Sequence, residues 1–208
     1  MQNPLRYPHM RAQYGASFYS PEELKLLGFK SLGEDILLSR QARIYAAHRI
    51  ELGDCVRIDD FAILSGAIKL GSFIHISAHA SIMGGDGITS SVTMGDFSSL
   101  SLGGRILSSS DDLSGSVLVN SCVEVAYRGI KGSHIVLPRH NHIGALSIVL
   151  PNTTFEEGAN LGPNSLVGDM VLKGFGYYFG SPARLIKMLD RGRVLELEAR
   201  FLDELKTR

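Results

Sequence analysis

Apolar residues recur at every sixth position along the first half of the chain. Ten of them follow one another without a break, in the series Leu52, Ile58, Leu64, Leu70, Ile76, Ile82, Ile88, Met94, Leu100 and Ile106. A period of six fits neither the 3.6-residue period of an α-helix nor the alternation of an ordinary strand. It predicts a chain wound into a prism, in which each face carries one short strand and each strand points one large apolar residue inward.

The same period continues on both sides of this series. Four residues with the same spacing precede the series, but their register is offset from it by two positions. Six more residues resume the period after an interruption. The two groups are Leu32, Leu38, Ile44 and Ile50, then Leu137, Ile143, Val149, Phe155, Leu161 and Val167. A second column lies four residues after these positions and consists mostly of small or β-branched residues: Val56, Ala62, Ile68, Ile74, Ala80, Val92 and Ser98, then Ser147, Thr153, Ala159 and Ser165. We expect both columns to face an interior too narrow for two large side chains per strand.

The remaining segments divide the chain into three parts. We expect an irregular arm and a short helix over residues 1–31, because Ser-Pro-Glu-Glu at residues 20–23 provides an N-cap, a proline at the first helical position and a capping box. The coil domain spans residues 32–182 and is interrupted by an inserted loop at about 107–136, a length that is typical of functional loops. Residues 183–208 contain helix formers with a loose apolar side, and they predict a helix that caps the end of the coil.

The composition narrows the set of partners. Lys plus Arg and Asp plus Glu each total 21, so no net field favours a nucleic acid or an anionic membrane, and we expect neither as a partner. No stretch approaches the ~18 apolar residues of a spanning helix, so we expect no membrane insertion. Cys55 and Cys122 form neither a CxxC motif nor a metal-ligand cluster, which predicts ordinary thiols in the cytoplasm and no metal site.

Six stretches carry a likeness to known sequences: Arg57-Ile58-Asp59-Asp60-Phe61, Ile74-His75-Ile76-Ser77-Ala78, Ser108-Ser109-Ser110-Asp111-Asp112, Ile143-Gly144-Ala145-Leu146-Ser147-Ile148-Val149-Leu150-Pro151, Gly162-Pro163-Asn164-Ser165-Leu166-Val167 and Gly180-Ser181-Pro182-Ala183-Arg184. On these stretches the chain resembles the hexapeptide-repeat acyltransferases. The likeness is greatest to the galactoside or nucleotide-sugar acetyltransferases, which acetylate sugars in surface-polysaccharide pathways. The resemblance implies an all-β fold, the left-handed parallel β-helix, assembled as a homotrimer. It also implies acetyl-CoA as the co-substrate, bound in the groove between adjacent prisms.

The resemblance assigns acetyl-CoA to the last coils of the prism. By motif position, it implicates Gly144, Ala145, Gly162 and Pro163 along the pantetheine arm, and Arg184 and Lys187 at the CoA phosphates. One residue departs from the family, which commonly has alanine at the position of Pro163. Proline has no N–H to donate, so either the contact there is to a carbonyl or the arm lies slightly differently.

Four residues are candidates for activating the acceptor: His75, Asp111, Asp112 and His140. The histidine base of the galactoside-type relatives is replaced here by Asp111, followed by Asp112. A carboxylate deprotonates an alcohol poorly but can orient or deprotonate an ammonium, which favours an amino-sugar substrate. His75 resembles a histidine that approaches the acetyl group in amino-sugar N-acetyltransferases. Because their spacing in the sequence equals two full coils, we expect His75 and Asp111 on one edge of the prism, about 10 Å apart. His140 follows the long loop and is a candidate to reach the groove of an adjoining subunit.

Asp59 and Asp60 are candidates to contact sugar hydroxyls or an ammonium, although corner aspartates that accept backbone N–H bonds fit the pattern equally well. The sequence and its resemblance together predict a cytoplasmic acetyl-CoA-dependent acetyltransferase that N-acetylates a nucleotide-linked amino sugar for O-antigen or capsule assembly. Two alternatives stay open. One is O-acetylation of a sugar hydroxyl by the same fold, with His75 or His140 as the base. The other is a non-catalytic β-helix that serves as a scaffold.

Overall fold

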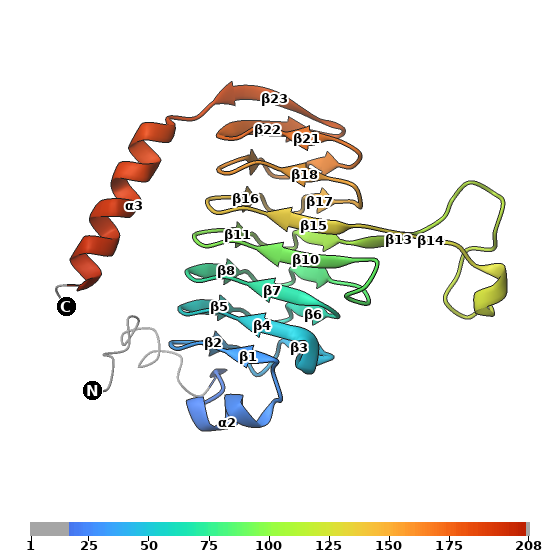
Figure 1. Cartoon of the computed structure of the whole chain (residues 1–208), viewed down its shortest axis with the longest axis horizontal. Helices are drawn as coiled ribbons and strands as arrows, with labels where there is room; N and C mark the ends of the chain where they lie inside the picture. The colour runs from blue at the N-terminus through green and yellow to red at the C-terminus, as the bar shows by residue number, and fades with distance from the viewer. Residues whose placement is uncertain (1–16, 207–208) are drawn as a thin grey trace.

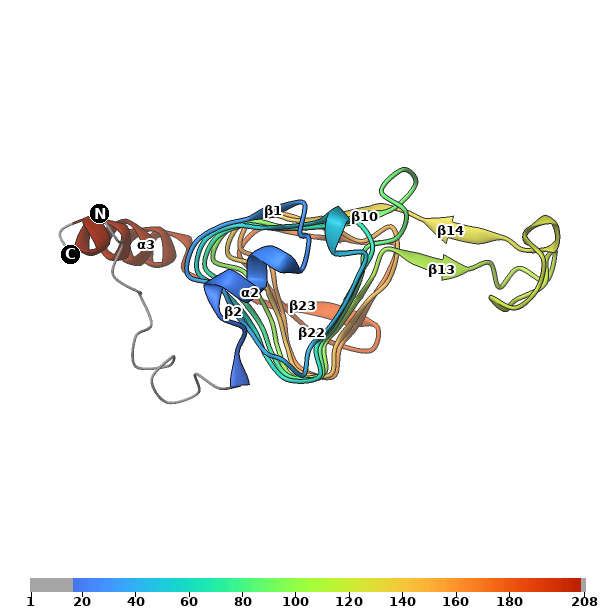
Figure 2. The same ribbon diagram turned by 90° about the horizontal axis from the view of Figure 1, so that it is seen from below.

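The computed structural model describes residues 17–206, so most of the predicted N-terminal arm lies outside the described residues. Within this range the chain winds into a three-sided prism of stacked coils, a parallel β-helix (Figure 1). Seen from below, the chain passes from β1 (Ser31–Leu32) to β2 (Leu37–Leu38) counter-clockwise while it recedes from the viewer, so the helix is left-handed (Figure 2). The predicted fold class is therefore confirmed.

Each side of the prism is a sheet whose neighbouring strands lie one coil apart. The first face contains β1, β4 (Ile50–Leu52), β7 (Ile68–Leu70), β10 (Ser91–Met94) and β15 (His134–Leu137), and is continued by the paired strands β18 (Thr154–Phe155) and β21 (Val171–Leu172). The second face contains β2, β5 (Val56–Ile58), β8 (Ile74–Ile76), β11 (Ser99–Leu100), β16 (His142–Ile143), β19 (Asn160–Leu161), β22 (Gly176–Gly180) and β23 (Ala183–Met188). The third face contains β3 (Arg43–Tyr45), β6 (Ile63–Ser65), β9 (Ser81–Met83), β12 (Arg105–Leu107), β17 (Ile148–Val149) and β20 (Leu166–Val167).

The two predicted columns form the interior of the prism. With the exceptions of Leu32, Ile44 and Ile88, every residue of the six-residue series is buried, and so is every residue of the second column. The predicted slip is also confirmed by the strand register. Leu32 pairs with Leu52 and Leu52 pairs with Leu70, so the first of these coils is longer than the second by the two slipped positions. Large and small inward residues thus fill the narrow core together.

Ile88 is the one wrong assignment in the main series, because its side chain is 82% exposed. Leu52 of β4 pairs with Leu70 of β7, which in turn pairs with Met94 of β10, so the second of these coils is longer by one full repeat. The extra residues leave the prism as a loop, in which the Asp86 carboxylate accepts hydrogen bonds from the backbone N–H groups of Ile88 and Thr89, each at 2.8 Å. An insertion of one repeat length preserves the period in the sequence although the inserted residues are not part of the coil.

The N-terminal end of the prism is covered by α2 (Pro21–Leu26). The predicted capping box is confirmed: the Ser20 side chain accepts from the Glu23 backbone, and the Glu23 side chain accepts from the Ser20 backbone at 2.7 Å. The helix places Leu24 on the core, where its side chain is only 2% exposed. After the helix the chain turns at Gly28, whose φ of 74° lies in the left-handed region that glycine tolerates.

The C-terminal segment differs from the predicted capping helix. Residues 183–188 form the strand β23, which turns back antiparallel to β22 and closes the last coil. The helix α3 (Arg191–Lys206) then runs beside the prism rather than across its end (Figure 1). Its position follows from contacts with the corner between the first and second faces, where Phe201 packs edge-on against Phe73 at 5.4 Å and Phe97 at 6.1 Å.

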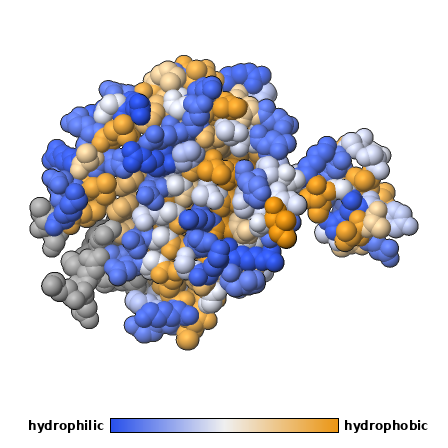
Figure 3. Space-filling view, in the orientation of Figure 1, coloured by the Kyte–Doolittle hydropathy of each residue, from blue (hydrophilic) through white to orange (hydrophobic). Residues whose placement is uncertain are grey.

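The interruption of the repeat is a projecting hairpin. β13 (Ser109–Asp111) and β14 (Ile130–Gly132) pair antiparallel and carry the chain away from the corner between the third and first faces (Figures 1 and 2). The 3₁₀ turn η3 (Val125–Tyr127) lies in the segment between them, and a second such turn, η2 (Ala47–Arg49), precedes β4. Apolar surface is visible on the projecting part in Figure 3.

Candidate active site

A column of polar side chains runs along the outside of the second face. Its members occupy paired positions on β5, β8, β11, β16, β19 and β22: Arg57, His75, Ser99, His142, Asn160 and Tyr177. In β8 the residues on both sides of His75, Ile74 and Ile76, point into the core, so alternation along the strand directs the histidine outward. The repeat that builds the core therefore also aligns this polar column.

His75 is held from the coil below by Asp59. Its Nε2 lies 2.8 Å from Oδ2 of Asp59, and the Arg57 Nε donates to Oδ1 of the same carboxylate at 2.6 Å. The Ser77 hydroxyl lies farther from Nε2, at 3.5 Å. The side chain of Asp59 is 16% exposed and that of His75 is 43% exposed. Asp59 is thus the partly buried link between Arg57 and an accessible imidazole.

The ionisation of Asp59 follows from these contacts. Partial burial raises the pKa of Asp59, but the hydrogen bonds from His75 and Arg57 outweigh it and hold the pKa below its ordinary value. Asp59 is therefore an anion at neutral pH. Its charge stabilises a positive charge on the neighbouring imidazole, which is the form that a histidine takes after it accepts a proton.

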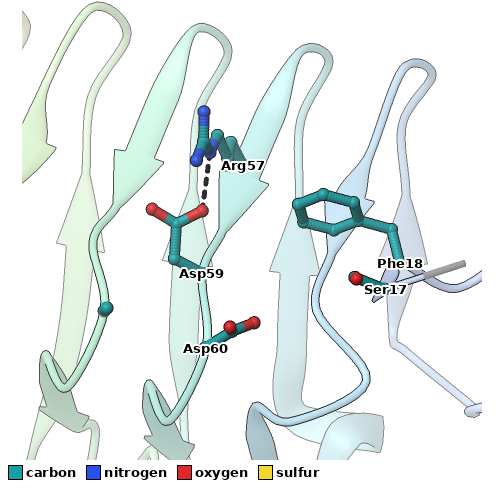
Figure 4. A pocket seen from close by; sticks show the side chains of 6 residues that line it. Ser17, Phe18, Arg57, Asp59 and Asp60 are labelled. Carbon is teal, nitrogen blue, oxygen red and sulfur yellow. Dashed lines mark hydrogen bonds and ion pairs between the residues drawn. The ribbon is translucent and has the colours of Figure 1, made fainter. Parts of the chain in front are cut away.

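A cavity of about 310 Å³ adjoins this pair and is lined by Ser17, Phe18, Arg57, Asp59, Asp60 and Ala78 (Figure 4). Asp59 and Asp60, expected to contact the sugar, both line this cavity. Asp60 also accepts a hydrogen bond from the Ser39 hydroxyl, so each carboxylate already has a protein partner. Figure 4 shows Arg57 and Asp59 joined by their hydrogen bond, with Ser17 and Phe18 on the neighbouring segment.

The expectation that His75 and Asp111 share an edge is wrong. The partner of His75 on the next coil is Ser99, because the inserted loop at Asp86 lengthens that coil by one repeat. Asp111 lies in β13, on the hairpin that has left the prism. There its Oδ1 is 3.9 Å from a terminal nitrogen of Arg128, while Asp112 pairs with Lys131 at 3.0 Å. Both aspartates lie at the base of the projecting hairpin.

His140 lies apart from His75, at the corner between the first and second faces. Its side chain is 10% exposed beneath α3, and its Nε2 is 3.1 Å from Oε2 of Glu198. Glu198 also accepts a hydrogen bond from Arg139 at 2.9 Å, and the His140 ring stacks on Phe97 at 5.4 Å. In this chain His140 therefore anchors the C-terminal helix.

Within residues 17–206, no group of three or more His, Cys, Asp or Glu side chains is arranged to hold a metal ion. In the same part of the chain, none of the helices combines the length and apolar character needed to cross a membrane.

Comparisons with known proteins identify relatives over nearly the whole chain. A dTDP-4-amino-4,6-dideoxy-D-glucose acyltransferase of Escherichia coli is 36% identical over 182 residues, which cover 86% of this chain and 92% of the relative. The chain belongs to the hexapeptide-repeat acyltransferase family. No family model matches the sequence.

Solved structures agree with this assignment. The N-acyltransferase AntD of Bacillus cereus, in complex with dTDP and 3-hydroxybutyryl-CoA, is 39% identical, has a TM-score of 0.87, and covers 91% of this chain and 98% of its own. A variant of AntD in complex with dTDP-4-amino-4,6-dideoxyglucose and coenzyme A has a TM-score of 0.86, covering 90% of this acyltransferase and 98% of its own chain at 39% identity. A hexapeptide-repeat acetyltransferase of Vibrio cholerae is 17% identical with a TM-score of 0.51, covers 88% of this chain and 92% of its own, and supports the fold alone.

The residues that the resemblance assigns to acetyl-CoA occupy the upper coils of this acyltransferase. Gly144 and Gly162 stack directly, and a Cβ on Gly144 would lie 2.5 Å from the Gly162 backbone, so close coil stacking itself requires glycine there. Ala145 and Pro163 follow them at the corner between the second and third faces. Arg184 and Lys187 are exposed on β23 and paired with β22, beyond these glycines along the prism.

Of the six residues in the polar column, only His75 was among the candidates predicted from the sequence. Ser99 and His142 extend the column above His75, and the Ser99 hydroxyl lies 2.7 Å from Nδ1 of His142. The inserted loop at Asp86 separates His75 from Ser99 in the sequence, and the projecting hairpin separates Ser99 from His142. Neither spacing is a multiple of the regular three-repeat coil. From the sequence alone, these residues could have been placed in one column only if the lengths of both insertions had been known.

Proposed function

We propose that this acyltransferase transfers an acyl group from acyl-CoA to the amino group of a dTDP-linked 4-amino-4,6-dideoxy sugar. The support is the similarity over about nine-tenths of the chain to acyltransferases described with dTDP, a dTDP-amino sugar or an acyl-CoA. The observation that carries the chemistry is the accessible His75, supported by the anionic Asp59 beside a cavity. Such an imidazole is the usual general base in acyl transfer.

The reaction then proceeds in a balanced sequence. The acceptor enters as an ammonium, and His75 takes a proton from the nitrogen so that its lone pair attacks the thioester carbonyl carbon. A C–N bond forms and the C–S bond breaks, while the nitrogen gives a second proton to the departing CoA thiolate. The products are an amide and CoA thiol, and His75 returns its proton to solvent. A positioned base contributes about 10²–10⁴ in rate to such a step.

The remaining assignments complete the proposed site. Gly144, Ala145, Gly162 and Pro163 accommodate the pantetheine arm, with Arg184 and Lys187 at the phosphates. Asp60 faces the sugar, and Asp111 and Asp112, on the hairpin of a neighbouring copy, help His75 to activate the acceptor amine. His140, whose Nε2 lies 3.1 Å from Glu198 of its own chain, contributes to the site of an adjoining subunit.

We also propose a homotrimer, on the evidence of the hairpin. Six of its large apolar side chains are exposed to solvent: Leu113, Leu118, Val119, Val125, Tyr127 and Ile130. Contact with another copy of the chain would remove these side chains from water. Replacing residues 113–128 by a short Gly-Ser linker is expected to give monomers in sedimentation, whereas an unchanged trimer would exclude the hairpin from the interface.

The setting proposed for this activity is cytoplasmic synthesis of nucleotide sugars for a surface polysaccharide such as O-antigen or capsule. Cys55 and Cys122 are not joined in a disulfide, in keeping with a reducing compartment.

The test is to incubate the protein with acetyl-CoA or 3-hydroxybutyryl-CoA and dTDP-4-amino-4,6-dideoxyglucose, following thiol release and product mass. We expect a mass gain of one acyl group on the amine and no gain with dTDP-glucose, which offers only hydroxyls. A gain on dTDP-glucose alone would favour O-acylation, and no acyl-CoA binding would favour a scaffold. His75→Asn should lower kcat/KM by about 100-fold or more. His134→Asn is the matched control, because His134 also lies outward on a strand, bonded to Ser91 at 2.8 Å.

A further inference from the structure

We propose that Asp59 is a positioning residue rather than a substrate ligand, and that it makes Nδ1 of His75 the nitrogen that accepts the proton. This inference rests on the proposed function and specifies how its base works. The hydrogen bond between Nε2 of His75 and Oδ2 of Asp59, at 2.8 Å, is the observation that carries it.

The first step concerns the proton on the imidazole. Arg57 is always charged and donates to Oδ1 of Asp59 at 2.6 Å, so the carboxylate stays ionised. An ionised carboxylate only accepts hydrogen bonds. The hydrogen between Asp59 and His75 must therefore belong to Nε2 of the histidine, which fixes the neutral imidazole in the Nε2–H tautomer and leaves the lone pair on Nδ1.

The second step concerns what else faces the imidazole. From β5 and the turn after it come Arg57 and Asp59, and from β11 comes the uncharged Ser99. Ser77, on the same coil as His75, lies 3.5 Å from Nε2. Within residues 17–206, Nδ1 has no hydrogen-bond partner, and the side chain is 43% exposed. The nitrogen with the lone pair is thus the one available to an acceptor.

The third step concerns Asp59 itself. Each of its oxygens has a donor from the protein, and the side chain is 16% exposed. A carboxylate so occupied contributes by orienting the imidazole and stabilising its protonated form, as second-shell carboxylates do in other sites. Asp60 lines the same cavity and has no contact with His75 among the described hydrogen bonds, so it remains the candidate sugar ligand of the two aspartates.

The inference is tested first without turnover, by ¹⁵N NMR of the full chain labelled at histidine, with His75→Asn to assign the signals. In the neutral form of the imidazole, we expect His75 as the Nε2–H tautomer. A majority of the Nδ1–H tautomer would overturn the proposal even if the enzyme is active. The absence of any amide product would instead overturn the proposed function, so the two failures are distinguishable.

Two variants should then shift the acidic limb of the pH profile of kcat/KM in opposite directions. Asp59→Asn removes a negative charge that stabilises protonated His75, so the acidic limb should move to lower pH by about one unit and kcat should fall about tenfold or more. Arg57→Gln removes a positive charge but keeps the carboxylate, so the same limb should move to higher pH. The KM for acyl-CoA should stay unchanged in both.

A purely structural role for Asp59 would lower activity without moving the limb in opposite directions. Identical pH profiles in the wild type and both variants would overturn the inference. If Asp59→Asn does not fold, as judged by circular dichroism, the wild-type NMR result and the Arg57→Gln profile still decide it.

Discussion

The serine at position 147 offers the sharpest test of how the coils are held together. Its side chain is fully buried, its hydroxyl donates to the Gly162 carbonyl at 2.7 Å, and it accepts from the Ser165 backbone N–H at 3.0 Å. One hydroxyl therefore satisfies two buried backbone groups on the next coil. Ser147→Ala removes that hydroxyl and leaves both groups without this partner.

The expected cost follows from the number of groups left unsatisfied. Each of the two buried groups that loses its partner costs about 1–3 kcal/mol, so the free energy of unfolding should fall by about 2–6 kcal/mol. For a chain of this size the midpoint Tm falls by about 2–4 °C per kcal/mol, which gives a decrease of at least about 4 °C. Circular dichroism against temperature and against urea measures both quantities.

The control is Ser116→Ala on the projecting hairpin, where the exposed hydroxyl bonds only to other hairpin groups such as Ser114 at 2.7 Å. It should change the free energy of unfolding by less than about 0.5 kcal/mol. All measurements use one protein concentration, because assembly would make Tm concentration-dependent. A Ser147→Ala change as small as that of the control would refute the reasoning, since the two backbone groups would then have other partners.

Three further outcomes follow from the structure. Ile82→Ala should lower the free energy of unfolding by about 2–5 kcal/mol, whereas Ile88→Ala should change it by less than about 0.5 kcal/mol in the same urea titration; equal effects would contradict the loop assignment. The backbone N–H groups of Ile88 and Thr89 hold the pKa of Asp86 well below its ordinary value, so the stabilisation by the ionised carboxylate is present above about pH 4 and is lost as the pH falls further. The protection factor of the Ile88 amide, its intrinsic exchange rate divided by the observed rate, should therefore fall below that pH, and a constant protection factor would count against this reasoning. Glu198→Gln weakens the contacts with Arg139 and His140, so amide exchange in α3 should accelerate about tenfold or more while β22 is unaffected, and unchanged protection of α3 would show that other contacts hold it.

The hexapeptide period was sufficient to predict the prism because its cause is local. Every strand must place one apolar residue inside, as Leu100 and Ile143 do on adjacent coils, and this requirement repeats with the chain. The capping box at Ser20 was predictable for the same reason, since all of its partners lie within one helical turn. At Ile88 the period is misleading, because a loop of one repeat length is indistinguishable from a strand by period alone.

The site was only partly predictable. His75 and Asp59 were both identified as candidates, but with separate roles, and their contact between adjacent coils was not foreseen. The position of His142 above His75 depends on the lengths of two insertions, neither of which the local pattern measures.

By itself, the sequence determined the β-helix, the positions that fill its core and the resemblance that led to its acyltransferase family. The tertiary structure decided which outward residues share a column, that Asp59 bonds to His75, that Asp111 leaves the prism, and that α3 lies on the corner at Phe73 and Phe97. The physical reason is that every coil has the same local requirement: its inward residues must be apolar or small, because the narrow core excludes water. The outward contacts depend on which coils the insertions bring side by side.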